Sequence, residues 1–163
     1  MSAVVLRDAD WRDIPAMARL ERATFPEDAW TEASFWSELA QRPRRAYVVA
    51  VPEADVAGAG RVLGQAGLDL AGEVADVMTV AVDPAARGRG VGARLLASLH
   101  ERALASGARR VMLEVRADNT AALGLYLRRG YRTVRTRPGY YRSTGGGRPV
   151  DALVLRKELV GDE

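Results

Sequence analysis

Cysteine is absent from the 163 residues, and histidine and lysine occur once each, as His100 and Lys157. Without cysteine the chain has no disulfide, no thiolate metal ligand and no cysteine nucleophile. A single histidine also excludes a histidine-rich metal site, so we expect no metal. No apolar run approaches the roughly 20 residues of a membrane span, and the charged N-terminal segment leaves no room for a signal peptide. These absences predict a cytoplasmic protein with no membrane partner.

The rest of the composition is that of a globular protein. Apolar residues make up 48% and charged residues 28%, which are ordinary values, and the chain is long enough to bury a core. We therefore expect one domain over residues 1–163. The net charge of +3 is unevenly spread, because seven arginines and no acid lie between Asn119 and Val150. Such a stretch can meet phosphates, but arginine replaces lysine throughout, so we interpret most of these arginines as ordinary surface residues.

Hydrophobic periodicity predicts an alternation of strands and helices of the α/β class. Asp10 and Thr31 are typical helix N-caps, and Gly107 and Gly130 are typical helix ends. Apolar spacing in the first helix includes one acid, Glu21. The predicted strands cover residues 4–7, 46–51, 61–70, 73–82, 110–116, 131–137 and 150–157, and the predicted helices cover residues 10–25, 31–41, 91–106 and 119–129.

A glycine-rich segment, residues 87–93, follows a buried strand and opens a helix. It reads Arg-Gly-Arg-Gly-Val-Gly-Ala. Helix N-termini carry unpaired N–H groups and the positive end of the helix dipole, and glycine lets a bulky anion approach the backbone. The two arginines add positive charge. The segment therefore predicts a pyrophosphate site at a helix start, with a ligand-free glycine-rich helix entry as the alternative.

A dinucleotide fingerprint is a rival interpretation of the same segment. Gly88, Gly90 and Ala93 have its spacing, and Glu114 lies about 20 residues further on, where that fingerprint has an acid. However, residues 83–87 separate the strand from the first glycine, where a tight turn is needed. Too few residues follow Glu114 for a second nucleotide-binding half. These two features argue against a nicotinamide cofactor.

The sequence Val-Ala-Val-Asp-Pro at residues 80–84, followed by the glycine segment, resembles the acetyl-CoA motif of the GNAT acyltransferases. The resemblance implies the GNAT fold, with a mixed, mostly antiparallel central sheet flanked by helices, and acetyl-CoA as cosubstrate. It further implies that the backbone of Val80, Ala81 and Val82 lines the pantetheine and thioester. The pyrophosphate would be held by Arg87, Gly88, Arg89, Gly90, Val91, Gly92 and Ala93.

Three later segments, residues 113–119, 125–131 and 140–153, resemble the RimI-type enzymes of this family, as do Phe25-Pro26 and Trp30. Those enzymes acetylate the N-terminal alanine of a small-subunit ribosomal protein, so the implied partner is a protein N-terminus, and we expect a monomer or weak dimer. The last loop departs from the pattern, with Pro-Val before Asp151 and a glycine run at residues 145–147. Acetylation of other protein N-termini, lysines or small amines stays open. A non-catalytic module that binds CoA or the ribosome also stays open as an alternative, although no RNA-binding aromatic motif is present.

The resemblance assigns two catalytic residues. Glu114 alternates away from the apolar face of its predicted strand, and the resemblance implies that it is the general base, acting through water; alternatively it is a surface carboxylate paired with Arg116 or another arginine. Tyr126 would be the general acid for the CoA thiolate; alternatively it is a core aromatic. Asn119 lies seven residues before Tyr126, hence on the same helix face, and would bind the same cofactor arm.

Further predictions concern the remaining parts of the reaction. No side chain offers itself as oxyanion donor, so a backbone N–H near Val82 is the candidate. His100 is predicted to be a surface residue without a catalytic role. The resemblance suggests that the acceptor is bound by Tyr140, Tyr141, Phe25 and Trp30.

Overall fold

A computed structural model describes residues 2–58, 60–142 and 147–159 of the chain. The strands are β1 (Val4–Asp8), β2 (Arg45–Pro52), β3 (Gly64–Leu70), β4 (Val74–Val82), β5 (Arg110–Arg116), β6 (Arg132–Tyr141) and β7 (Val150–Glu158). The helices are α1 (Ile14–Thr24), α2 (Glu32–Leu39), α3 (Val91–Ala105) and α4 (Thr120–Arg128), with short 3-10 turns at Trp11–Asp13, Glu53–Asp55 and Pro84–Ala86.

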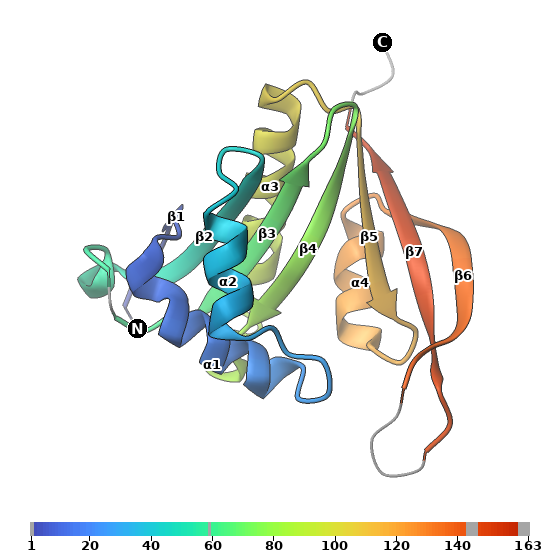
Figure 1. The fold of residues 1–163 in the computed structure, drawn as a ribbon, viewed down its shortest axis with the longest axis horizontal. Coiled ribbons are helices and arrows are strands. Elements are labelled where there is room, and N and C mark those ends of the chain that lie inside the picture. Colours follow the sequence, from blue (N-terminus) through green and yellow to red (C-terminus); the bar gives the residue numbers. More distant parts are fainter. Residues whose placement is uncertain (1, 59, 143–146, 160–163) are drawn as a thin grey trace.

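The strands form one seven-stranded sheet in the order β1-β2-β3-β4-β5-β7-β6. Only the β4–β5 pair is parallel, and all other neighbours are antiparallel. Helices α1 and α2 cover one face, and α3 covers the other (Figure 1). The predicted α/β class, the mostly antiparallel sheet and the order of the elements are therefore confirmed.

Each face of the sheet has its own apolar core, because side chains alternate along the strands. In β2, Tyr47, Val49 and Val51 pack under α1 and α2. Their neighbours Val48 and Ala50 join the larger core under α3, which extends to α4. The same alternation in β5 buries every second residue and leaves Glu114 off the apolar face, as its sequence predicts.

The sheet opens between β4 and β5. The two strands pair over only three residue pairs, from Val74 with Arg110 to Asp76 with Met112, and then diverge (Figure 1). A β-bulge accompanies this divergence, since Gly67 pairs with Thr79 while Leu68 pairs with Val77, which leaves Met78 as the extra residue. Bulges increase strand twist and redirect side chains. A cavity lies between the diverging ends of the two strands.

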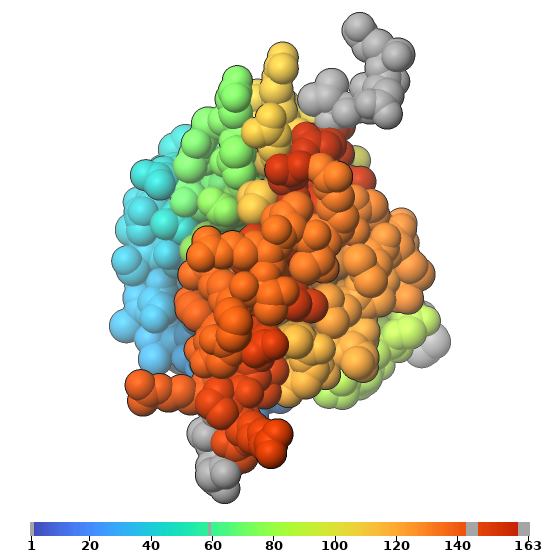
Figure 2. All heavy atoms as spheres, turned by 90° about the vertical axis from the view of Figure 1, so that its right-hand side faces the viewer, coloured from blue at the N-terminus to red at the C-terminus, as the bar shows by residue number. Residues whose placement is uncertain are grey.

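The edge strand β6 differs most from its predicted bounds. It continues through Pro138 and Gly139 to Tyr141, with a register irregularity after Arg137. Proline is tolerated here because the outer side of an edge strand needs no ladder hydrogen bond. Figure 2 shows the segment of β6 and β7 spread across one face of the molecule. Of the predicted glycine run, residues 145 and 146 lie outside the described residues.

Candidate active site

One cavity of about 440 Å³ opens where the glycine segment meets α4. Its walls come from the end of β4, the loop into α3, the first turn of α3 and one side of α4. Its lining includes most of the residues predicted to bind the cofactor, namely Val80, Val82, Arg87, Gly88, Gly90, Val91, Gly92, Ala93, Asn119 and Tyr126. The helix start and the diverging strand thus form one hollow.

The backbone of the glycine segment is shaped for close approach. Gly88 and Gly90 both have φ of +74°, and a Cβ at either would meet nothing within 4 Å. Gly90 is the N-cap of α3 and makes no side-chain cap hydrogen bond, so no side chain occupies that place at the helix start. A Cβ on Gly92 would come within 3.0 Å of Leu125. An anionic group such as a pyrophosphate suits this cradle.

The positive charge of the cavity comes partly from arginines that the sequence did not single out. Arg87 lines the cavity as predicted, together with Arg128 and Arg129 at the end of α4. Arg89 is not among the lining residues, and its side chain donates to the carbonyl of Ser2 at 3.1 Å. Ala81 does not line the cavity either, because its side chain is buried under α1 and α2. Arg128 and Arg129 are exposed at the surface, and from there they also line the cavity.

A second, smaller cavity of about 140 Å³ lies between the diverging ends of β4 and β5. Four successive β4 residues, 77–80, line it, which strict alternation would not allow and the bulge at Met78 explains. The residues shared by both cavities are Phe25, Val80, Asn119, Ala122 and Tyr126. Two ligands could therefore meet at this common wall.

Glu114 lies on the wall of the second cavity, and its side chain is 32% exposed. Its Oε1 is 3.1 Å from Nη2 of Arg137 on β6. The sequence left a pairing with Arg116 or another arginine open, and Arg137 is the partner. The Arg137 guanidinium also lies 5.4 Å from the ring centre of Tyr140. A carboxylate at this place can accept a proton from a group in the cavity.

Tyr126 lies on the common wall and is 6% exposed. Its ring packs edge-on against Tyr131 with centroids 5.6 Å apart. Burial, and then the nearby Tyr141, raise the pKa of Tyr126 to about 12. The hydroxyl therefore keeps its proton at neutral pH and can serve as a donor. Asn119 lines both cavities too, and its Oδ1 caps α4 by accepting from the Ala122 N–H at 3.2 Å.

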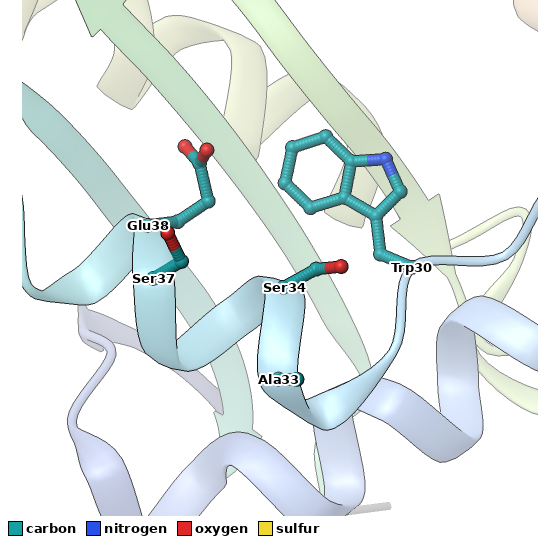
Figure 3. A pocket seen from close by; sticks show the side chains of 5 residues that line it. All are labelled: Trp30, Ala33, Ser34, Ser37 and Glu38. Carbon is teal, nitrogen blue, oxygen red and sulfur yellow. The ribbon is translucent and has the colours of Figure 1, made fainter.

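The four predicted acceptor-binding aromatics are not equivalent. Phe25, Trp30 and Tyr141 line the second cavity. Tyr140 lines none of the described cavities, is 52% exposed, and packs edge-on against Tyr141. The Trp30 indole also borders a neighbouring hollow, which is lined further by Ala33, Ser34, Ser37 and Glu38 of α2 (Figure 3).

Two polar residues of the second cavity, Glu21 on α1 and Thr79 on β4, were not predicted. Glu21 is 2% exposed, and both of its oxygens accept from the Thr79 hydroxyl, at 3.1 and 3.2 Å. Burial raises the pKa of Glu21, with hydrogen bonds from Gln65 and Thr79 opposing the shift. The sequence did indicate that Glu21 is unusual, because this acid stands at a position where the helical pattern of α1 otherwise has apolar residues.

His100 is not a plain surface residue, contrary to the sequence interpretation. Its Nε2 is 2.7 Å from the hydroxyl of Tyr131. Burial, followed by Lys157 and Arg129, lowers its pKa to about 4. His100 lines neither cavity, so its contact with Tyr131 is a packing feature of the α3 core.

The paired cavities, the glycine cradle and the opening in the sheet can hold two ligands against a common wall, one of them with an anionic group at the helix start. A family model described as the Acetyltransferase (GNAT) family matches residues 14–131, which is most of the chain. The chain therefore belongs to the GNAT acetyltransferases. Among the described residues no cluster of acidic or histidine side chains could hold a metal ion, and no helix there is long and apolar enough to cross a membrane.

Relatives within the family are similar over nearly the whole chain. The N-alpha-acetyltransferase RimI of Mycobacterium tuberculosis is 38% identical over 90% of this chain and 87% of its own. An uncharacterized protein of Mycobacterium leprae is 40% identical over 90% of this chain, which spans 38% of that longer relative. The crystal structure of the ribosomal-protein-S18-alanine N-acetyltransferase from Escherichia coli superposes with a TM-score of 0.83 at 26% identity, covering 99% of this chain and 97% of that one.

Proposed function

We propose that this chain transfers the acetyl group of acetyl-CoA to the N-terminal α-amino group of a protein, and that its acceptor is the N-terminal alanine of a small-subunit ribosomal protein. The observation that carries the proposal is the junction of the two cavities, because Asn119 and Tyr126 face both. The relatives named for alanine or N-alpha acetylation support the choice of acceptor.

In this proposal the cofactor lies in the larger cavity. The cradle of Gly88 and Gly90 and the charges of Arg87, Arg128 and Arg129 would hold the pyrophosphate. Past Asp76, β4 still pairs with β3 but no longer with β5, so the backbone groups on its β5 side are available to the pantetheine arm. A backbone N–H near Val82 would stabilise the oxyanion that forms at the thioester carbon.

The acceptor amine lies in the smaller cavity and reaches the thioester across the common wall. The amine arrives as ammonium, so it must lose a proton before it can attack. Glu114 takes that proton, directly or through water. As the tetrahedral intermediate collapses, the carbon–sulfur bond breaks and Tyr126 gives its proton to the departing CoA sulfur. The nitrogen loses its second proton in the same step, and that proton restores the Tyr126 hydroxyl, so the products are the neutral amide and the CoA thiol. Phe25, Trp30 and Tyr141 enclose the acceptor, and Tyr140 extends this wall outward.

The test measures release of the CoA thiol with a peptide that begins with alanine. Glu114→Gln and Tyr126→Phe should each lower kcat/KM by about a hundred- to ten-thousand-fold, the usual contribution of a positioned acid or base. Glu158→Gln is the matched control, because Glu158 is a half-exposed carboxylate that also pairs with arginines, Arg110 and Arg156, away from the cavities. Unchanged rates in both site variants would refute the catalytic assignment.

The acceptor is tested with a substrate panel. Wild-type protein should acetylate the alanine peptide with a higher kcat/KM than lysine-containing peptides with a blocked N-terminus, polyamines or amino sugars. Faster turnover of a small amine would refute the proposed acceptor. Binding of CoA or of ribosomes with no acetyl transfer to any amine would refute the proposed catalysis altogether.

A further inference from the structure

Glu21 is a buried carboxylate that no arginine neutralises in the structure. It projects from α1 towards the sheet and accepts hydrogen bonds from two neutral groups. Gln65 Nε2 donates to its Oε2 at 2.9 Å, and the Thr79 hydroxyl donates at 3.1 and 3.2 Å. Gln65 Nε2 also donates to the carbonyl of Met17 at 3.1 Å. Over residues 2–58, 60–142 and 147–159, Glu21 makes no ion pair.

The two other buried carboxylates of the described residues, Asp13 and Asp69, each pair with arginine. Asp13, which is 1% exposed, receives two hydrogen bonds of 2.7 Å from the Arg7 guanidinium. Asp69, at 7%, pairs with Arg44 and Arg45. Burying a charge without an opposite charge is costly, and folded proteins avoid it. Because this chain is rich in arginine, the lack of a cation beside Glu21 calls for a cation from elsewhere.

Glu21 is also the part of this cluster that opens to a ligand. It lines the smaller cavity, together with Thr79 from the strand opposite. On the same cavity wall, Asp28 adds negative charge that further raises the pKa of Glu21. Gln65 is fully buried and its Oε1 has no hydrogen-bond partner, so the polar cluster is not saturated from within. An ammonium group in the cavity would supply the missing positive charge.

We propose that Glu21 binds the amino group of the acceptor, so that the α-ammonium is held between α1 and the opened sheet before Glu114 removes its proton. This inference rests on the proposed transfer to an amine, and it deepens it by assigning recognition and deprotonation to different carboxylates. Glu21 does not line the cofactor cavity. Its contribution is therefore confined to the acceptor.

The test is a thermodynamic cycle that combines one substitution in the protein with the removal of the amino group from the peptide. Dissociation constants are measured by calorimetry for a peptide that begins with alanine and for its des-amino analogue, which begins with a propionyl group. Wild-type protein should prefer the amino peptide by about 10- to 100-fold, the range expected for a charge-assisted hydrogen bond. Glu21→Gln should reduce this preference to a few-fold or less while leaving acetyl-CoA affinity unchanged.

Glutamine at position 21 can still accept from Gln65 and Thr79, so the variant removes charge with little change of shape. Glu38→Gln is the control, because Glu38 is a mostly buried carboxylate on α2 that accepts from the Tyr47 hydroxyl at 2.8 Å and does not line the acceptor cavity. It should retain the wild-type preference. A Glu21→Gln protein with the full preference would overturn the inference.

Failure of the proposed acceptor gives a different result. If wild-type protein does not acetylate the alanine peptide but acetylates a small amine, the proposed acceptor is wrong. The cycle is then run with that amine and its des-amino analogue, and loss of the preference in Glu21→Gln still supports Glu21 as the amine-binding residue. Retention of the preference overturns it.

Discussion

Replacing Gly90 with alanine tests whether the backbone of the cradle is what binds the cofactor. Gly90 has φ of +74° and ψ of 12°, the left-handed region, and an added Cβ would meet nothing within 4 Å. The substitution therefore introduces backbone strain without a steric clash. A left-handed conformation costs an L-residue about 1–2 kcal/mol, which corresponds to about a 5- to 30-fold change in an equilibrium constant.

This cost must appear in one of two measurable quantities. If the free loop keeps its conformation, Gly90→Ala lowers the free energy of unfolding by about 1–2 kcal/mol. If the loop of the free protein relaxes instead, binding of acetyl-CoA must bring residue 90 back to the left-handed conformation. The dissociation constant for acetyl-CoA then rises by about 5- to 30-fold. The loss of stability measured by denaturant unfolding and the loss of binding free energy measured by calorimetry should together equal the strain of about 1–2 kcal/mol. The kcat at saturating acetyl-CoA should change little.

Gly72→Ala is the matched control. Gly72 has φ of +96°, and its added Cβ would also meet nothing within 4 Å. It lies in the turn between β3 and β4, at the opposite end of β4 from the cradle. Gly72→Ala should therefore lose stability while binding acetyl-CoA normally. Equal binding and equal stability of Gly90→Ala and wild type would refute the reasoning, because the conformation of Gly90 would then not matter.

Three further predictions follow from the described contacts. Changing Arg128 and Arg129 together to glutamine should weaken acetyl-CoA binding and reduce its salt dependence, measured by calorimetry at two ionic strengths, because both line the cofactor cavity. The pKa of His100 falls from 6.5 to about 4 on burial, so stability should decrease as pH drops from about 6.5 to about 4, and His100→Gln should lessen that decrease in denaturant unfolding. Thr31→Ala should lower the free energy of unfolding by about 1 kcal/mol, because the Thr31 hydroxyl caps α2 by accepting from the Ser34 N–H at 3.1 Å.

Local patterns in the sequence were sufficient for the elements and for part of the site. Period-two alternation in β5 separated Glu114 from its buried neighbours, and the structure has the same pattern. The glycine segment indicated a helix start, and α3 begins at Val91. The spacing of Asn119 and Tyr126 placed them on one helix face, and both line the two cavities. These features depend on residues close together in sequence.

The features that escaped the sequence depend on tertiary geometry. The bulge at Met78 and the opening between β4 and β5 arise from how strands twist against each other. The residue types at these positions do not predict either feature. Arg128 and Arg129 became cavity residues only because α4 lies beside the cradle. Arg137 reaches Glu114 across β7, from a strand distant in sequence. Glu21 differs, because an acid at a core position of α1 was visible in the periodicity.

The two cavities differ in charge, and the difference suits the order of events in the proposed reaction. The cofactor cavity carries Arg87, Arg128 and Arg129. The acceptor cavity carries three carboxyl groups, of Glu21, Asp28 and Glu114, and one arginine, Arg116, which is paired with Glu27 and Asp118. An ammonium ion is therefore attracted to the acceptor side and a pyrophosphate to the other.

Acetylation changes this balance within the acceptor cavity. In the proposed reaction the amine enters as a cation and leaves as a neutral amide, so its charge attraction to Glu21 and Glu114 ends when Glu114 takes the proton and does not return in the product. A buried carboxylate favours a cation far more than a neutral amide that lacks the charge. In the proposed reaction the acceptor side would therefore hold the substrate more strongly than the product, and the two products would occupy separate cavities that share one wall.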